Sequence, residues 1–151
     1  MSFPGFVQGV ASFAEATSYD SFQDLGPYST TDNGWVEAVK FEAVEAVIDG
    51  DYSVQWSLKS TQSKGGRNKG VQISFRPGDD VDNNPWEILN SNNTLQVPSD
   101  NVSLQYSGFV EVSLLNTDIY QVRVEFGQTV NGGTQTLEEI DVVVFRVGDL
   151  P

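Results

Sequence analysis

The sequence predicts an all-β domain folded as an antiparallel β-sandwich. Two observations point to this fold: four tracts of the chain alternate apolar and polar residues, and turn-forming dipeptides stand between the tracts. A period of two places one face of a strand in the core and the other face in water. Several such strands, joined by polar turns without helical segments between them, are typical of a sandwich or a barrel.

The last alternating tract differs from the others because both of its faces are apolar. Val143 and Phe145 stand out of phase with Ile140, Val142 and Val144. We therefore expect this strand to lie centrally in a sheet or against another chain. The four alternating tracts are Asp51–Leu58, Val71–Arg76, Tyr120–Phe126 and Ile140–Phe145. Shorter strands are expected at Trp86–Leu89, Thr94–Val97, Val102–Tyr106 and Phe109–Leu115.

One segment, Val36–Ile48, fits two structures. Its Glu and Ala content, and apolar residues at helical spacing, would suit an amphipathic helix. The alternation of Val39 and Phe41 fits a strand, and Asp49-Gly50 suits a tight hairpin into the strand that follows. We favour the strand and the hairpin.

Composition limits the chemistry that the chain can perform. The 151 residues suit a single domain, and 8 basic against 21 acidic residues give a formal charge of −13. That charge argues against binding to nucleic acid or to an anionic membrane. The chain has no Cys and no His, which removes thiol nucleophiles, the commonest general base and the commonest transition-metal ligands. We expect no catalytic residue, no cofactor and no membrane partner.

An acidic loop, Gly78–Pro85, invites comparison with a calcium site. Asp80, Asp82 and Asn84 stand at alternating positions, as at the start of an EF-hand loop. Pro85 occupies the place of the turn glycine, and no helices are expected to flank the loop. We favour a solvated loop and assign no metal site.

Trp86, which follows this loop, is the best candidate for a ligand surface. An exposed indole ring could stack on a sugar, although burial in a core or interface is the commoner fate of tryptophan. Carboxylate pairs such as Glu138-Glu139 could in principle serve a glycosidase, but an acidic chain yields such pairs by chance. A carbohydrate- or receptor-binding surface at Trp86 is therefore the alternative to a purely structural role.

The first nine residues are predicted to be an extended arm that precedes a single domain of residues 10–151. The arm carries Phe3 and Phe6 beside the backbone punctuators Pro4 and Gly5. It lacks the cationic and apolar regions of a secretory signal, so the mature chain is expected to begin at or near Met1. Buried aromatic residues are efficient anchors, so we expect Phe3 and Phe6 to contact a neighbouring protein.

Several tracts together resemble a known family. Gly50–Leu58 (GDYSVQWSL) resembles a strand of tumour-necrosis-factor-like and C1q-like jelly rolls, in the versions found in bacteriophage structural proteins. Ser107–Val112 with Leu114 resembles a later strand of those domains, and Asp118–Val122 the start of the next, although Asn116-Thr117 stands where glycine is usual. Further resemblances are the short first strand at Ala11–Glu15 and the buried last strand at Ile140–Val147.

The resemblance implies a jelly-roll-like sandwich that forms homotrimers. It also implies a non-enzymatic phage virion protein, assembled in the host cytoplasm, which decorates a capsid or builds a head fibre or a tail tip. Its expected partners are copies of itself and a major capsid or other virion protein. A closed trimer would cover outward-facing apolar residues such as Val143 and Phe145, which a monomer would expose.

Overall fold

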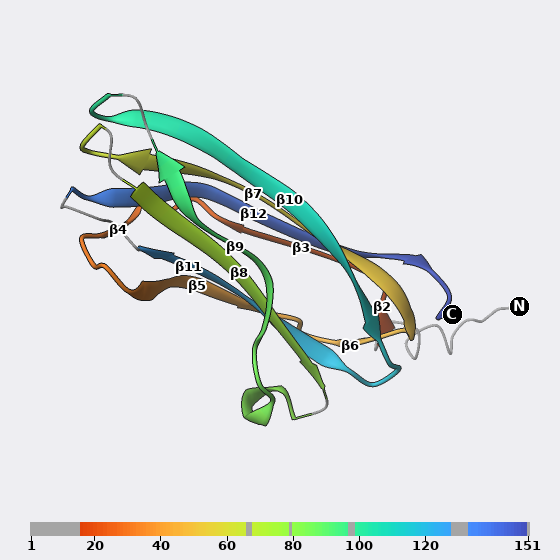
Figure 1. The fold of residues 1–151 in the computed structure, drawn as a ribbon. Helices are drawn as coiled ribbons and strands as arrows, with labels where there is room; N and C mark the ends of the chain where they lie inside the picture. Colours follow the sequence, from red (N-terminus) through yellow and green to blue (C-terminus); the bar gives the residue numbers. More distant parts are fainter. Residues whose placement is uncertain (1–15, 66–67, 79, 97–98, 128–132, 151) are drawn as a thin grey trace, which may run out of the picture.

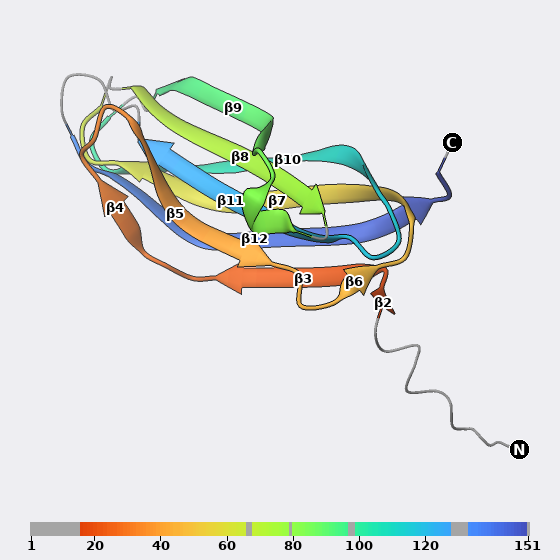
Figure 2. The same cartoon turned by 90° about the horizontal axis from the view of Figure 1, so that it is seen from below.

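The chain folds into two antiparallel β-sheets that pack face to face (Figure 1). The computed structural model describes residues 16–65, 68–78, 80–96, 99–127 and 133–150. One sheet has the strand order β10-β7-β12-β3, with β4 also paired to β12, and the other has the order β5-β11-β8-β9. Figure 2 shows the same two layers from below. The predicted all-β, jelly-roll-like sandwich is confirmed.

Every sheet strand pairs antiparallel, and only the two-residue strands β2 and β6 pair in parallel. The strands of the first sheet are β3 (Tyr19–Asp24), β4 (Tyr28–Thr30), β7 (Gly50–Gln62), β10 (Val102–Leu114) and β12 (Gln135–Gly148). Those of the second are β5 (Trp35–Glu42), β8 (Asn68–Gly78), β9 (Glu87–Gln96) and β11 (Ile119–Gly127). The short elements are β2 (Ala16–Thr17), β6 (Ala46–Val47) and the 3₁₀ turn η2 (Val81–Asn83).

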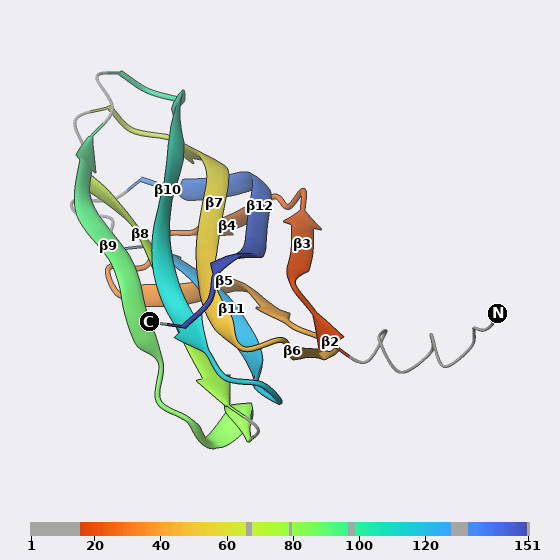
Figure 3. The same cartoon turned by 90° about the vertical axis from the view of Figure 1, so that its right-hand side faces the viewer.

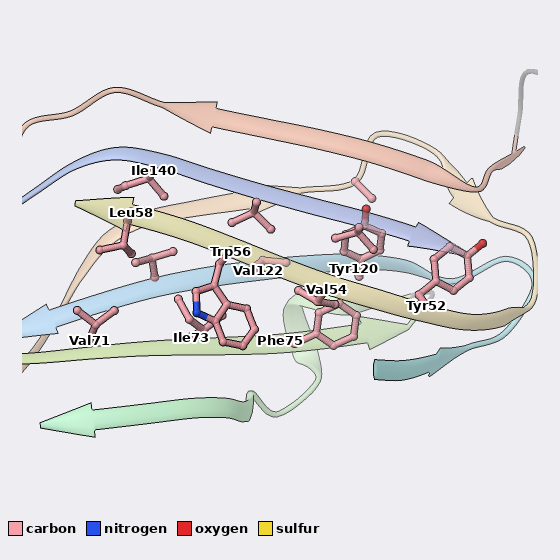
Figure 4. Packing of buried hydrophobic residues seen from close by; sticks show 14 of the residues in the cluster. Tyr52, Val54, Trp56, Leu58, Val71, Ile73, Phe75, Tyr120, Val122 and Ile140 are labelled. Atoms are coloured by element: carbon pink, nitrogen blue, oxygen red, sulfur yellow. The ribbon is translucent and has the colours of Figure 1, made fainter. Parts of the chain in front are cut away.

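The core lies between the sheets and is filled by the apolar phase of each alternating tract (Figure 4). Val54 and Leu58 of β7 are fully buried, and so are Val122 of β11 and Ile140 of β12. Each fully buried aliphatic side chain of this size contributes about 1.5–3 kcal/mol by leaving water. The period-two pattern in the sequence therefore marks the inner face correctly.

A buried glutamine ties the two sheets together at one end of the sandwich. The Gln135 side chain of β12 accepts a hydrogen bond from the Gly127 amide at 2.9 Å and donates to the Gly70 carbonyl at 3.0 Å. Its amide also lies 3.1 Å from Ser60 Oγ. A buried amide whose donors and acceptor are all paired costs little to desolvate, so Gln135 can link three strands within the core.

The two-sided apolar strand lies where the sequence places it. β12 is flanked by β7 on one side and by β3 and β4 on the other, so it is a central strand. The ambiguous segment forms strand β5 over Trp35–Glu42, which confirms the strand, and its last residues form a loop and β6. None of the described residues forms a helix that is long and apolar enough to cross a membrane.

Two local predictions are wrong. Asp49-Gly50 does not close a hairpin, because β5 pairs with β11 in one sheet whereas β7 pairs with β10 and β12 in the other. Gly50 begins β7, has φ +157° and lies so close to Arg146 and the Gly148 carbonyl that a Cβ atom would clash with them. Glycine is therefore needed where the chain enters the first sheet, and not for a hairpin turn. The expected separation of Trp86–Leu89 from Thr94–Val97, and of Val102–Tyr106 from Phe109–Leu115, is also absent, since β9 and β10 are each one continuous strand.

Candidate assembly surface

The outer face of the β10-β7-β12-β3 sheet carries two cross-strand rows that contain apolar side chains. In the first row, Phe109 of β10 lies opposite Gln55 of β7, Gln55 opposite Val143 of β12, and Val143 opposite Ser21 of β3. Because Val142 and Val144 are buried in the core, Val143 must point to the opposite face.

The second row lies one pleat further along the same strands. Glu111 pairs with Ser53, Ser53 with Phe145, and Phe145 with Tyr19. Ser53 is only 4% exposed although it is on the outer face, so its larger neighbours in the row cover it. We call Tyr19, Phe109, Val143 and Phe145 the apolar face.

Exposure makes the apolar face unusual for a water-facing sheet. Phe109 is 65% exposed and Tyr19 is 58% exposed, while Val143 and Phe145 are half-buried. Single exposed apolar residues are normal, but several grouped on adjacent strands mark a surface that contacts another molecule. The two residues predicted from the sequence, Val143 and Phe145, thus lie together at the centre of this group.

Charged groups border the apolar face toward one end of the strands. Lys59 Nζ lies 3.3 Å from Glu139 and 3.8 Å from Glu138, on exposed side chains. Exposed pairs of this kind contribute little to stability. They matter for assembly because the Glu138 and Glu139 carboxylates lie outside the rows of Val143 and Phe145.

The outer face of the second sheet has a different character. Gln72, on β8, donates to Glu125 at 2.9 Å and accepts from Ser91 at 2.9 Å. Gln121, fully buried on β11, donates to Glu42 and accepts from Arg76. These glutamines are paired across the strands, whereas Ser74 Oγ and Arg123 Nε on the same face are buried without a hydrogen-bond partner. This face is therefore more polar than the apolar face.

Trp86 is half-buried and lies over two arginines of that polar face. The guanidinium carbons of Arg76 and Arg123 lie 4.2 and 4.3 Å from the centre of its ring. A sugar that stacked on Trp86 would have to compete with these cation–π contacts. Sugar binding at Trp86 stays a prediction that the geometry does not favour. Trp56, in contrast, is a core residue at 4% exposure, as its phase in β7 predicts.

The acidic loop is held together by its own contacts. Arg76 forms an ion pair with Asp82 at 3.6 Å, and the Asn84 side chain donates to the Pro77 carbonyl at 2.6 Å. Within the described part of the chain, no group of three or more acidic side chains is placed to hold a metal ion. The described residues also enclose no pocket.

One half-buried acid links the two sheets. Asp20 of β3 accepts a hydrogen bond from the Tyr120 hydroxyl of β11. Burial raises the pKa of Asp20, and the hydrogen bond from Tyr120 partly opposes this. Burial and the bond to Asp20 also raise the pKa of Tyr120. The pair secures the edge strand β3 to the opposite sheet, beside the Tyr19 end of the apolar face.

Comparison with known proteins supports the fold. No protein-family model matches the chain, and no curated protein matches its sequence. A chain from the structure of the infectious bursal disease virus Gx strain superimposes with a TM-score of 0.58 at 12% identity, over 90% of this chain and 34% of that chain. The VP2 subviral particle of the same virus gives 0.54 at 12% identity, over 87% and 34%. This chain spans about a third of the length of those viral chains.

A third similar structure is not viral. Eiger TNF from S. frugiperda superimposes with a TM-score of 0.51 at 9% identity, over 89% of this chain and 96% of that chain. Identities this low establish a shared jelly-roll-like sandwich and no more. The fold is thus similar to that of virus-particle chains and of a tumour-necrosis-factor protein, and the second of these agrees with the tumour-necrosis-factor-like jelly roll that the sequence motifs resemble.

Sequence reasoning found half of the apolar face. Val143 and Phe145 were identifiable because β12 is apolar in both phases. Tyr19 and Phe109 were missed, although Phe109 is the one apolar residue on the polar phase of β10 (VSLQYSGFVEVSL). Phe3, Phe6 and the expected first strand at Ala11–Glu15 lie outside the described residues.

Proposed function

We propose that this chain is a non-enzymatic structural protein of a bacteriophage virion, which forms a homotrimer and decorates a capsid or builds a head fibre. The observation that carries the proposal is the apolar face on one sheet of a jelly-roll-like sandwich. The outer face of the other sheet carries hydrogen-bonded glutamines and ion pairs, so the two outer faces differ in polarity. Similar sandwiches occur in virus particles, which is compatible with this role.

The apolar face supports self-association for a physical reason. A closed assembly removes Phe109, Tyr19 and their neighbours from water in every copy at once. It must do so in a chain that carries a formal charge of −13, so the contact has to avoid placing carboxylates opposite one another. The residues directly beside Val143 and Phe145 across the strands are Ser21, Ser53, Gln55 and Tyr19, none of them charged, and Glu111 lies two strands away at the end of its row.

The mass of the protein in solution tests the trimer. Light scattering after size exclusion is expected to give three times the 16.5 kDa of one chain. Val143→Lys is expected to yield monomers, even though an added cation lowers the net repulsion between copies. Ile88→Lys is the matched control, since Ile88 is an exposed apolar residue on the other sheet. A wild-type monomer, or equal effects of the two variants, would rule the contact out.

The N-terminal arm is proposed to attach the trimer to the particle. Phe3 and Phe6 would be buried against a capsid or fibre protein, where aromatic anchors carry much of the binding energy. Deletion of residues 1–9 is expected to leave the fold and the trimer unchanged and to abolish labelling of purified particles by antibody raised against the protein. Unchanged labelling of particles assembled with the deletion variant would refute this attachment role.

A further inference from the structure

The strand β10 is the longest edge strand of the molecule and the most regular. It ends the order β10-β7-β12-β3, so among the described residues its outer side has no partner strand. It pairs with β7 over thirteen consecutive residues, from Val102 opposite Gln62 to Leu114 opposite Gly50, without a bulge. A straight edge leaves a row of unpaired backbone donors and acceptors that can accept another strand.

β10 also lacks the features that usually protect such an edge. Its thirteen residues contain no Pro, no Lys and no Arg, and its one charged residue is Glu111. The other edge strands differ: β3 carries Asp20 and Asp24, β5 carries three charged residues, and β9 has two register shifts against β8. Charges and bulges of this kind discourage pairing between molecules.

The core beside β10 is open on the same side. Inward residues of β10 are only half-buried, although the β7 residues opposite them are fully buried: Tyr106 faces Leu58, and Val110 faces Val54. Figure 3 shows β9 and β10 running along one side of the sandwich, where the Tyr106 hydroxyl reaches Asn90. An added strand would therefore cover apolar side chains as well as backbone groups.

We propose that β10 pairs with β10 of a second copy, antiparallel, about a twofold axis that passes through Gly108. This axis is the one that overlaps all thirteen residues, because it sets Val102 opposite Leu114 of the second copy. Inward-facing residues of one copy then lie opposite inward-facing residues of the other, and outward-facing residues opposite outward-facing ones. The half-buried apolar side chains on the inner face of β10 in the two copies are therefore neighbours in one continuous sheet. The seam would be about 44 Å long at ~3.4 Å per residue.

Charge favours a second copy as the occupant. In this register Glu111 lies opposite Gln105 of the second copy, an amide that can donate to a carboxylate. The two Glu111 side chains are six residues apart along the seam, or about 20 Å, which exceeds the ~8 Å screening length at physiological salt. For an acidic chain, β10 is thus a surface on which two copies can meet without opposing acids.

The seam is also large enough for a specific contact. A strip about 44 Å long needs to be only about 18 Å wide to bury the ~800 Å² per partner of a standard interface. The sandwich edge is two sheets thick, with sheets ~10 Å apart and side chains beyond them. Edge pairing does not depend on the proposed virion role, and it uses no residue of the apolar face except Phe109.

Charge changes at Gln105 test both the pairing and its register. Gln105→Glu places like charges opposite each other twice in the pair and is expected to raise the dissociation constant about tenfold, since opposed cross-strand charges are destabilising. Gln105→Lys is expected to lower it by a similar factor. The double variant Gln105→Glu with Glu111→Gln keeps the charge of −13 and is expected to restore wild-type association. Asn33→Glu and Asn33→Lys are the matched controls, since Asn33 is an exposed residue in the loop before β5, away from both proposed contacts.

Sedimentation velocity and hydrogen exchange, both on the full chain over a range of concentrations, supply the readouts. Edge pairing links the species that the apolar face forms into larger ones as concentration rises, and amide protection within residues 102–114 is expected to rise with it. Equal effects at Gln105 and Asn33, or exchange of residues 102–114 that does not depend on concentration, would overturn the pairing. Val143→Lys acts on the apolar face, so failure of the trimer and failure of the edge contact are told apart.

Discussion

Gly108 offers a direct test of how the core is packed, because a tryptophan ring occupies the space of its missing side chain. A Cβ atom built on Gly108 would lie 2.8 Å from Trp56 Cζ2 and 3.1 Å from Cε2. Trp56 is 4% exposed, so the ring has little room to move aside. Gly108→Ala is therefore expected to destabilise the protein.

Two opposing effects set the size of the loss. Forcing an extra methyl group into a packed core costs about 1–3 kcal/mol. Replacing glycine by alanine lowers the entropy of the unfolded chain and returns about 0.4–1 kcal/mol. The free energy of unfolding should therefore fall by about 1–2 kcal/mol, equivalent to a midpoint lower by about 3–6 °C for a domain of this size.

Urea denaturation of a double-mutant cycle distinguishes this clash from a general intolerance of substitution. Phenylalanine lacks Nε1 and Cζ2 of the indole, so Trp56→Phe should relieve the contact, and Gly108→Ala should cost at least ~1 kcal/mol less in that background. Additive effects, within the ~0.3–0.5 kcal/mol typical of independent sites, would show that the ring is not the obstacle. A more stable Gly108→Ala single variant would refute the packing argument outright.

Three further predictions address the turn, the buried acid and the tryptophan. Thr117 has φ +82° in a turn closed by a hydrogen bond from the Asp118 amide to the Leu115 carbonyl. Glycine adopts this conformation without strain, so Thr117→Gly should raise the free energy of unfolding in urea by about 1 kcal/mol. Burial raises the pKa of Asp20 in the folded state, so the folded protein binds a proton there more readily than the unfolded chain does. The wild type should therefore gain stability relative to Asp20→Asn as pH falls through that pKa. Equal changes of stability with pH in the two proteins would contradict this. Trp86→Ala removes two cation–π contacts and should lower the free energy of unfolding by about 2 kcal/mol. The variant and the wild type should give the same result on a glycan array.

The features that follow from periodicity were predictable from the sequence. Alternation in β7, β8, β11 and β12 marks the inner face of each strand, because the same two-residue period governs side-chain direction and burial. The central place of β12 followed from its second apolar phase. The same phase identified Val143 and Phe145, since a residue out of phase with the core must face outward.

Features that depend on which strands pair were not predictable. Asp49-Gly50 has the composition of a hairpin turn, but a dipeptide does not reveal whether the next strand joins the same sheet. Tyr19 becomes part of the apolar face only because β3 pairs with β12 across more than a hundred residues of chain. Trp86 looked exposed in the sequence because its contacts, Arg76 and Arg123, come from two other strands.

The distribution of charge connects the two proposed contacts. A chain with 21 acidic residues repels its own copies, so association requires surfaces where carboxylates are few or lie at the margin. Both such surfaces belong to the same sheet: the central rows at Val143 and Phe145, and the edge strand β10 with Glu111 as its single charge. The second sheet instead pairs charges internally, as Arg123 with Glu125 and Arg76 with Asp82. One sheet is therefore arranged for contact between copies and the other for water, and substitutions that add charge should disturb assembly only on the first.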